Sequence, residues 1–379
     1  MSPFVLDLEK TKIGSSIVRL EPALNAFGSM LLISKAEDEP GIHEWVTKTR
    51  LQMSSEERFR HKLVTIGFHY AILPKVTGVS FETYLDNLET TPPSEFRDRL
   101  LNAYSKICLT EEMQENKDQP VDWDEVLSSA KDYVEFLRSR FGEEMTDEEV
   151  ETRAYEYVID PAALKQLVTG HIRWFWKNYL QAEWTRVRPM LEESAKAFNQ
   201  IDYGNMTRTE IVQFVTGKDI SSESKWESKW GEEFLNTREL IFIPNAHFGP
   251  YIRMDKIRDT FYVYFGAHLP EGSDVRVPEL DRSEIVSRIS ALADDTRLHI
   301  LQMIAEKGEM RSQEIMEATN LSQPSVSRYL SQLTAAGYLQ ERRANGAKAY
   351  ILNQDRIEKT LKAVHAFLLG HSYLVSPKE

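Results

Sequence analysis

The sequence predicts an α+β protein that is predominantly helical, and three observations support this prediction. Apolar residues recur at three- and four-residue spacings along most of the chain up to residue 215, as they do on the buried face of a helix. Two β-rich runs follow at residues 239–243 and 260–265. The C-terminal part then shows three helical patterns followed by a pair of short β-prone runs. This order predicts a helical N-terminal domain with a small sheet, and a separate C-terminal module.

Helical periodicity or helix-capping residues mark most of the N-terminal part. The predicted helices are residues 22–35, 42–53, 54–72, 81–88, 94–108, 122–141, 147–157, 161–198 and 207–215. Prolines break the pattern at residues 90–93 and 115–120. The two β-rich runs are predicted to pair as a small sheet, to which Leu6 or residues 17–20 can add a strand.

A stretch rich in proline, glycine and serine, residues 269–279, is the best linker in the chain. We therefore predict a regulatory, effector or partner-binding domain over residues 1–270, a linker over 271–280 and a compact module over 281–374. At 379 residues, of which 41% are hydrophobic, the chain is long enough to build a core in each part.

Cysteine usage and hydropathy bear on the cellular compartment. The single cysteine, Cys108, excludes a disulfide framework within the chain and is typical of a reducing compartment, so a cytoplasmic location is expected. The sequence contains no signal peptide and no apolar run of about twenty residues. Neither secretion nor a membrane partner is therefore predicted.

The first helical pattern of the module covers residues 283–306 and is interrupted at Asp294 and Asp295. These acidic residues can cap a helix that starts near Thr296, because their side chains accept hydrogen bonds from free backbone N–H groups. Lys307 and Gly308 are typical of a helix end. The next pattern, residues 312–319, opens with Ser312 as a capping residue, and Asn320-Leu321 forms the turn that follows it.

The most informative segment is residues 322–333, which read SQPSVSRYLSQL. Ser322 is a good N-cap and Pro324 falls in the first turn, where a missing N–H costs little. Apolar residues at 326, 330 and 333 share one face, which anchors the helix. The open side carries polar side chains without an acid: Gln323, Ser325, Ser327, Arg328 and Gln332. Such side chains contact base edges and phosphates in the major groove, so a DNA recognition helix is predicted; a solvated face without a partner is the alternative.

The two β-prone runs, residues 338–343 and 348–352, flank Asn345-Gly346, a pair that favours a tight hairpin turn. Arg342, Arg343 and Lys348 cluster on this hairpin, where they can reach phosphates or the minor groove. Charged residues that keep an exposed strand edge soluble are the alternative. Helices followed by a basic hairpin in this order are the layout of a winged helix-turn-helix module.

The net charge of −13 is unevenly distributed along the chain. Residues 281–379 carry 13 Lys/Arg and 12 Asp/Glu, a net charge of +1, so the preceding part has a net charge of −14. Between residues 322 and 350 only Glu341 opposes four basic residues. The basic surface is therefore local, as groove binding requires, and the acidic part is suited to sensing or partner binding rather than to DNA.

The segments ALADDTRLHIL (residues 291–301) and LSQPSVSRYLSQLTAAGYL (residues 321–339), with the hairpin ending in AYIL, resemble the ArsR-type (arsenic-repressor-like) winged-helix family. The resemblance covers residues 283–369 only. It implies a homodimer on a pseudo-palindromic operator in double-stranded DNA, acting as a repressor that an effector such as a small molecule releases. Residue by residue, it implies DNA contacts from Gln323, Ser325, Ser327, Arg328, Arg342, Arg343 and Lys348.

One departure from the family concerns metal ions. Metal-sensing members carry a cysteine pair on the helix before the recognition helix, or carboxylate and histidine ligands on the terminal helices. Residues 313–319 read QEIMEAT and contain no cysteine, which excludes the thiolate route. His365 and His371 with Glu358 are the remaining candidates, with surface histidines as the alternative. We predict no metal site and no cofactor.

The last helical pattern, residues 355–370, carries an apolar stripe suited to packing against a partner helix. We predict a dimer interface in which this stripe meets the first helix of the module; packing within one monomer is the alternative. The interface residues are Ile285, Ile289, Ile357, Leu361, Val364 and Leu368.

Residues 171–184, HIRWFWKNYLQAEW, place more large aromatic residues on one helix than one core face holds. A hydrophobic ligand pocket with Arg173, Trp174 and Tyr179 is one interpretation, and a core or interdomain helix is the other.

No catalytic motif is found: the sequence contains no His-Glu-x-x-His, glycine-rich phosphate loop or Gly-x-Ser-x-Gly. The pairs His61/His69 and His247/His268 lack a ligand spacing and are predicted to be structural. The preferred hypothesis is a dimeric transcriptional repressor, not an enzyme, gated through its N-terminal domain. An enzyme domain fused to an ArsR-type module, and an N-terminal domain that only enlarges the dimer, are the alternatives.

Overall fold

The computed structural model describes residues 17–35, 43–107, 120–218, 220, 234, 237–249, 251–257, 260–270, 282–344 and 347–369. The chain forms two compact units. The helical unit comprises residues 21–36 and 47–186, and the second unit comprises residues 1–20, 37–46 and 187–379. Helices predominate among the described residues, and the strands form two small sheets. The predicted α+β, predominantly helical fold class is confirmed.

The predicted linker, residues 271–280, and Leu6 lie outside the described residues. The boundary between the units falls inside a helix, between residues 186 and 187, rather than at the linker. The domain ranges given above therefore stay a prediction.

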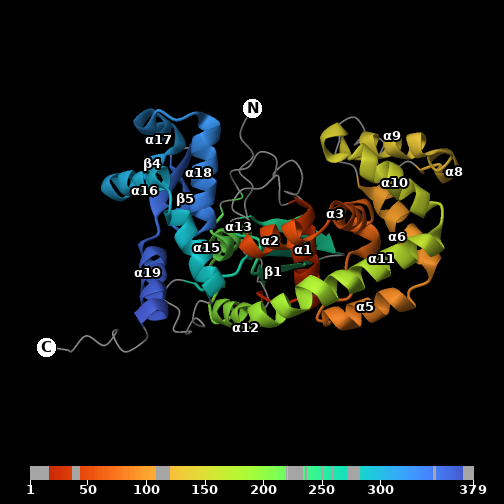
Figure 1. The fold of residues 1–379 in the computed structure, drawn as a ribbon, viewed down its shortest axis with the longest axis horizontal. Helices are drawn as coiled ribbons and strands as arrows, with labels where there is room; N and C mark the ends of the chain where they lie inside the picture. The colour runs from red at the N-terminus through yellow and green to blue at the C-terminus, as the bar shows by residue number, and fades with distance from the viewer. Residues whose placement is uncertain are drawn as a thin grey trace. The chain divides into compact units, whose positions relative to one another are not determined.

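Among the described residues, the elements of the helical unit are all helices (Figure 1). In chain order, its complete elements are α1 (Pro22–Lys35), α3 (Ser55–Lys62), η1 (Leu63–Gly67), α4 (His69–Ile72), α5 (Phe81–Thr90), α6 (Pro93–Lys106), α8 (Trp123–Val126), α9 (Ala130–Phe141), η2 (Glu143–Met145), α10 (Glu148–Val158), α11 (Pro161–Phe175) and η3 (Trp176–Leu180). It also contains most of α2 (Glu44–Gln52) and the start of α12 (Gln181–Phe198).

Local capping explains where several of these helices begin. The hydroxyl of Ser54 accepts from the backbone N–H of Glu57, and the Glu57 carboxylate accepts from the Ser54 N–H, which forms a capping box for α3. Asp147 caps α10 and Asp160 caps α11 in the same position. Pro161 then occupies the first turn of α11, where a missing N–H is tolerated.

Two helices predicted as continuous are interrupted by a π-helical turn. Residues 54–72 contain η1, in which the Phe68 N–H donates to the Leu63 carbonyl five residues earlier. Residues 161–198 contain η3 between α11 and α12. The predicted helix 122–141 is broken as well, because the Ser129 hydroxyl accepts from the Asp132 N–H and starts α9 afresh. Such turns leave no clear mark in an apolar spacing pattern.

Helix α11 lies beside α5 and α6 in the helical unit (Figure 1). Its buried side chains recur at helical spacing: Leu164, Val168, Ile172 and Phe175. This stripe accounts for the amphipathic pattern of the sequence and forms part of the core of the unit.

The second unit contains a three-stranded sheet with the order β1-β3-β2. Its strands are β1 (Glu239–Asn245), β2 (Arg253–Ile257) and β3 (Thr260–Gly266). The predicted pairing of residues 239–243 with 260–265 is confirmed, and it is parallel. Strand β2 was not predicted, and it pairs antiparallel to β3. Val18 adds a single bridge to Phe242, at the place predicted for a further strand.

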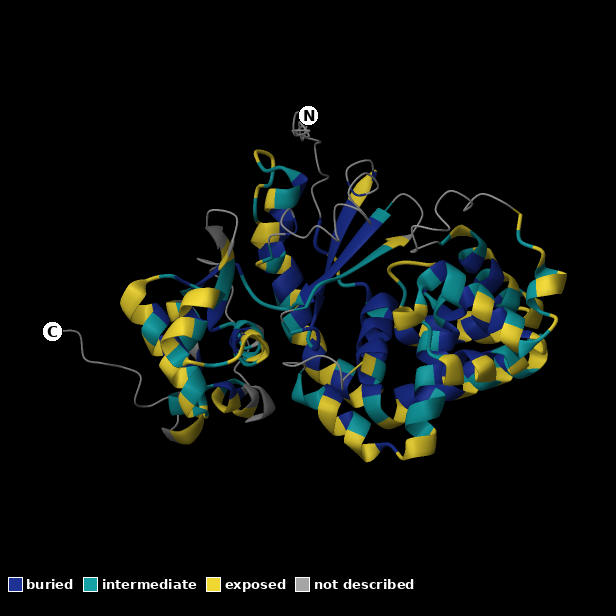
Figure 2. Ribbon diagram, turned by 90° about the horizontal axis from the view of Figure 1, so that it is seen from above, coloured by how far each residue is buried: buried dark blue, intermediate teal, exposed yellow. Residues whose placement is uncertain are grey.

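Strands β1 and β3 are buried along most of their length (Figure 2). Side chains from the end of α12 and from α13 (Arg208–Thr216) share a core with them, including Phe198, Ile211 and Val215. The Asn199 side chain accepts from the Val18 N–H at 3.1 Å and donates to the Val18 carbonyl at 2.7 Å. Burial on both faces explains why these strands read as continuous apolar runs.

The C-terminal part of this unit, called the winged module below, has its own apolar core. Its elements are α15 (Arg282–Leu292), α16 (Asp295–Lys307), β4 (Met310–Arg311), α17 (Ser312–Thr319), α18 (Gln323–Ala335), β5 (Leu339–Ala344), β6 (Ala347–Leu352) and α19 (Gln354–Leu369). The strands form a sheet with the order β4-β6-β5. The core includes Ile300 and Ile304 of α16, Ile315 of α17 and Leu330 of α18.

Candidate nucleic-acid interface

Helix α16 begins and ends where the sequence predicts. The Asp294 carboxylate accepts from the Arg297 N–H at 2.9 Å and caps the helix. Gly308, with φ of 79°, ends it in a backbone conformation that favours glycine. The two acidic residues that interrupt the apolar pattern thus separate α15 from α16.

The turn between α17 and α18 depends on Asn320, whose φ is 55°. Asparagine tolerates this left-handed conformation better than most residues with a side chain. The predicted Asn320-Leu321 turn is confirmed, but the predicted cap at Ser312 is wrong. Arg311 occupies the cap position and its backbone N–H donates to the Glu314 carboxylate at 2.6 Å, so Ser312 is already the first helical residue.

Helix α18 is held to the module by one face. Val326, Leu330 and Leu333 are fully buried in the module core, as the sequence predicts. Pro324 lies in the first turn, and Ser322 occupies the cap position without a capping hydrogen bond, since its hydroxyl lies 2.9 Å from that of Ser325.

The outer face of α18 presents Gln323, Ser327 and Arg328, all exposed. The Arg328 guanidinium lies over the Tyr329 ring, 5.3 Å from its centroid, and has no acidic partner among the described residues. Ser325 is half-buried. All five predicted recognition side chains therefore lie on α18, and three of them are exposed.

Gln332, the fifth predicted side chain, has a partner within the module. Its side-chain Oε1 accepts from Arg297 Nη1 of α16 at 3.1 Å, and the residue is half-buried. The sequence offered no sign of this contact, because the two residues lie 35 positions apart.

The wing is an antiparallel hairpin of β5 and β6, with Arg343 opposite Lys348 and Ala344 opposite Ala347. Residues 345–346 and the Arg343 side chain lie outside the described residues. The other predicted cations are paired with acids. Arg342 pairs with Glu309, and the Lys348 ammonium lies 2.9 Å from the Glu341 carboxylate. Both cations stay half-exposed, so they still face solvent.

A helix anchored by one face, with a polar outer face and a basic hairpin behind it, defines a winged helix-turn-helix module. Comparison with known proteins agrees. A family model described as bacterial regulatory protein, arsR family, matches residues 294–341.

Several relatives align with this same region. The chain is 34% identical over 74 residues to an uncharacterized HTH-type transcriptional regulator of Methanocaldococcus jannaschii, covering 20% of this chain and 83% of that protein. It is 50% identical over 52 residues to the arsenic resistance transcriptional regulator ArsR1 of Pseudomonas putida, covering 14% of this chain and 41% of the relative. It is 43% identical over 67 residues to a probable mercury resistance operon repressor of Streptomyces lividans, covering 18% of this chain and 53% of that protein.

The chain belongs to the ArsR family of helix-turn-helix transcriptional regulators. It spans about half the length of the arsenic and mercury resistance regulators that it matches. All three alignments leave the larger part of this chain unmatched.

The residues predicted for a dimer interface fall into two groups. Ile285 is 4% exposed, and Ile357 packs against the module core. Ile289 of α15 and Leu361 and Leu368 of α19 are exposed, and Val364 is half-buried. Helices α15 and α19 contact each other within the module, so the first group is available for packing within one monomer, while Ile289, Leu361 and Leu368 remain exposed.

The three side chains predicted to form a ligand pocket lie on the helical unit. Arg173 is exposed and pairs with Glu89 at 2.6 Å and Asp86 at 3.5 Å on α5. Trp174 and Tyr179 are half-buried and contact each other edge to face, with ring centroids 5.5 Å apart. Arg173 thus points to a different neighbour from the two aromatic rings.

A buried histidine pair beside these rings was not predicted. His61 Nδ1 lies 3.0 Å from His171 Nε2, and His61 Nε2 donates to the Met30 carbonyl at 2.8 Å. A carbonyl only accepts, so His61 Nδ1 is the acceptor for the His171 N–H. Burial lowers the pKa of both histidines, that of His61 to about 4. Both rings are therefore neutral at neutral pH.

A second buried titratable group of the helical unit is Glu151. Burial raises its pKa to about 8, and the neighbouring Asp147 adds to the effect. Tyr104 and Tyr133, both buried, lie near it. These groups are far apart in the sequence, so spacing rules gave no sign of the cluster.

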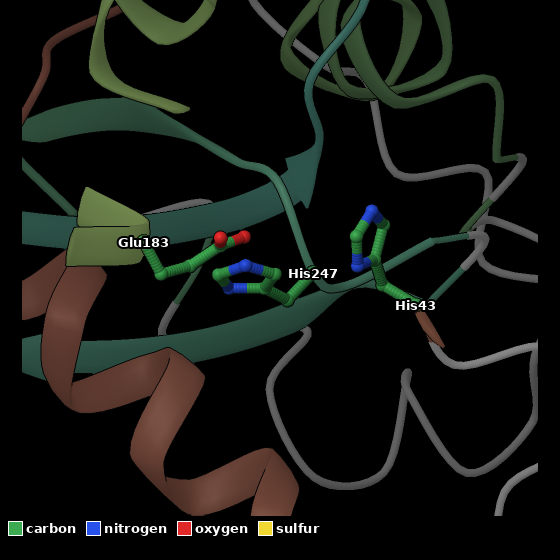
Figure 3. A group of neighbouring side chains, drawn as sticks. All are labelled: His43, Glu183 and His247. Carbon is green, nitrogen blue, oxygen red and sulfur yellow. The ribbon is translucent and has the colours of Figure 1, made fainter. Parts of the chain in front are cut away.

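His43 and His247 form an aromatic group in the second unit (Figure 3). His247 stacks on Trp45 with ring centroids 4.4 Å apart, and His43 Nδ1 accepts from the Trp45 N–H. The two imidazoles offer nitrogen atoms within 4.8 Å of each other. Glu183, also drawn in Figure 3, belongs to the helical unit, where it pairs with Arg186 at 2.7 Å. Two imidazoles are fewer ligands than a zinc site needs, so we assign no metal to them.

No helix among the described residues is long and apolar enough to cross a membrane.

Proposed function

We propose that the chain is a homodimeric, sequence-specific DNA-binding transcriptional repressor, released from its operator through the part of the chain that precedes the winged module. The observation that carries this proposal is the outer face of α18, which is polar, exposed and free of acidic residues. An acid-free face can approach phosphates without repulsion, and its amide, hydroxyl and guanidinium groups suit base edges.

The N-terminal half of α18 is the part best suited to the major groove. Gln323, Ser327 and Arg328 project from it, and the apolar residues behind them fix its orientation. Backbone N–H groups at a helix start also favour phosphate. In this arrangement Arg328 reads a base, and Arg342, Arg343 and Lys348 of the wing contact phosphates.

Exposed apolar residues on two adjoining helices support a dimer. Leu361 and Leu368 of α19 are 57% and 70% exposed and lie seven residues apart, on one helix face. Val286 and Ile289 of α15 are exposed too. A second copy of the chain is the occupant that a palindromic operator requires, because two recognition helices must be related by a twofold axis.

Two relatives are named for arsenic and mercury resistance, but this chain offers no cysteine on α17 to bind such ions. The effector is therefore proposed to act elsewhere. The helical unit, with the aromatic pair Trp174 and Tyr179, is where ligand screening should begin.

Selection from random duplex DNA with the full-length protein tests the function. We expect enrichment of a pseudo-palindrome whose half-sites lie one helical turn apart, about 34 Å. Recovery of unrelated sequences after several rounds would refute sequence-specific binding.

Sedimentation of Leu361→Glu tests the dimer. A buried charge at the interface should weaken dimerisation by roughly tenfold or more. Lys362→Ala on the same helix is the matched control and should leave the dimer intact, because Lys362 is exposed and pairs with the exposed Glu358. A Leu361→Glu protein that sediments as a dimer would place the interface elsewhere.

A further inference from the structure

The guanidinium of Arg297 connects three helices of the winged module. Arg297 lies in the first turn of α16, and its side chain is 16% exposed. Nη1 donates to the Gln332 side chain on α18 at 3.1 Å, and Nη2 donates to the Ser290 carbonyl on α15 at 2.8 Å. One planar group therefore bonds to two neighbouring helices.

The same residue is held at its base by Asp294. The Asp294 carboxylate accepts from the Arg297 N–H and lies 3.8 Å from the guanidinium Nε. Ser290 lies in the last turn of α15, and its carbonyl accepts from the guanidinium. The guanidinium thus contacts the end of α15, while the start of its own helix is capped by Asp294.

The two helices that Arg297 connects have different tasks in the proposed function. Helix α15 carries Ile289, directly before Ser290, on the face proposed for the dimer. Helix α18 carries Arg328, one turn before Gln332, on the face proposed for DNA. Apolar contacts between helices tolerate small shifts, whereas the two directed hydrogen bonds of an arginine fork fix both distance and angle.

We propose that Arg297 is a positioning residue that sets the spacing between the two DNA half-sites accepted by the dimer. The inference rests on the proposed function and adds a determinant that does not touch DNA. The two protomers are related by a twofold axis, so a shift of α18 relative to α15 occurs in both. The distance between the two recognition helices therefore changes by the sum of the two shifts. That separation must match about 34 Å along the duplex.

The test measures how affinity depends on half-site spacing. Full-length wild type and Arg297→Met are titrated against duplexes with the two selected half-sites at the selected spacing, and with one or two base pairs added or removed between them. For the wild type we expect affinity to fall about tenfold or more at the largest offsets. For Arg297→Met we expect the affinity at the selected spacing to fall, and the dependence on spacing to flatten.

Two further variants separate positioning from charge and from folding. Gln332→Met keeps the arginine charge and removes one hydrogen bond, so it should flatten the profile in part, and the double variant should be no flatter than Arg297→Met. Lys307→Met removes an exposed cation from the same helix and should preserve the profile. Circular dichroism confirms folding, and Gln332→Met still decides the question if Arg297→Met does not fold.

The outcomes distinguish the inference from the function on which it rests. If wild type binds with a preferred spacing and the variants keep the same profile at lower affinity, Arg297 is only a structural residue and the inference is refuted. If wild type binds no duplex specifically, the proposed function fails, and the inference fails with it.

Discussion

The winged module and the helical unit place their polar side chains in opposite ways. On the module, Gln323, Ser327 and Arg328 stand exposed on a helix whose other face is fully buried. In the helical unit, His61, His171 and Glu151 lie buried, and burial favours the neutral form of each. These polar groups of the module are accessible to a binding partner, whereas the titratable groups named here for the helical unit are buried in its core.

The difference predicts two kinds of sensitivity. Binding through exposed cations responds to salt, because counterions are released from the DNA. Stability that depends on buried neutral groups responds to pH, because the unfolded chain exchanges protons that the folded chain does not.

Leu330→Ala should destabilise the winged module by about 2–5 kcal/mol, because Leu330 is buried in its core. Hydrogen exchange of the α18 amides measures the loss. Ser327→Ala, exposed on the same helix, should leave exchange unchanged. Four of the seven tryptophans lie in the helical unit and none lies in residues 282–369, so most of the tryptophan unfolding signal should not move with Leu330→Ala. If that signal shifted as much as the exchange of the α18 amides, the winged module and the helical unit would unfold together, which would contradict the contrast between them.

The stability of the helical unit should vary with pH in two windows. In the folded state, burial lowers the pKa values of His61 and His171 below the usual 6.5, so the unfolded chain binds more protons at these residues and stability is lost as pH falls below 6.5. Glu151 has a folded-state pKa raised from 4.5 to about 8, so the folded chain binds its proton more tightly and stability is lost as pH rises from 4.5 to 8. Between 4.5 and 6.5 the two effects oppose each other, and the two histidines outweigh the one glutamate.

Glu151→Gln separates these contributions. It should abolish the loss of stability between pH 6.5 and 8 and steepen the loss below 6.5, by on the order of 1–3 kcal/mol across each window. Urea unfolding followed by tryptophan fluorescence measures both slopes. His299→Gln, at an exposed histidine of α16, is the control and should change neither. Parallel profiles for wild type and Glu151→Gln would show that Glu151 is not buried in its neutral form.

Arg328→Ala should weaken operator binding by about 1–3 kcal/mol and relax base preference at one position of each half-site. Its guanidinium has no acidic partner among the described residues and contacts only the Tyr329 ring on its own helix, so the loss in DNA binding should exceed the loss in stability, which should be about 1 kcal/mol or less. Fluorescence anisotropy on the selected operator and on its single-base variants gives the comparison. Equal losses on operator and random DNA would assign Arg328 to phosphate.

Glu341→Gln should have the smallest effect. Lys348 pairs with Glu341 at 2.9 Å and is half-exposed, and such surface pairs contribute about 0–1 kcal/mol to stability. Removing the acid frees the ammonium for phosphate, so affinity for all sequences should rise slightly and the salt dependence should steepen. Unchanged salt dependence would remove Lys348 from the phosphate contacts.

The contrast between the regions also explains what could be predicted from sequence. The helix caps at Asp294 and Gly308, the Asn320 turn and the buried face of α18 all depend on residues a few positions apart, and the structure confirms them. The spacing of the β-rich runs likewise predicted a paired sheet.

Contacts between distant residues could not be predicted in this way. His61 and His171 are 110 positions apart, and Arg297 and Gln332 are 35 apart. The sequence predicts Gln332 on the open face of α18, because no neighbouring residue indicates its hydrogen bond to Arg297 of α16. Strand β2 was missed because RMDKI is too polar for a buried strand, and its place at the sheet edge accounts for that composition.

Sequence-specific regulation requires that α18 of this chain read DNA sequence. The most direct test compares the dissociation constants of the full-length protein for its selected operator and for a shuffled duplex of the same composition, at a single fixed salt concentration. We predict that the operator binds roughly a thousandfold or more tightly than the shuffled duplex. Equal affinities for the two duplexes would contradict sequence-specific regulation and leave the winged module as a non-specific DNA-binding or protein-binding element.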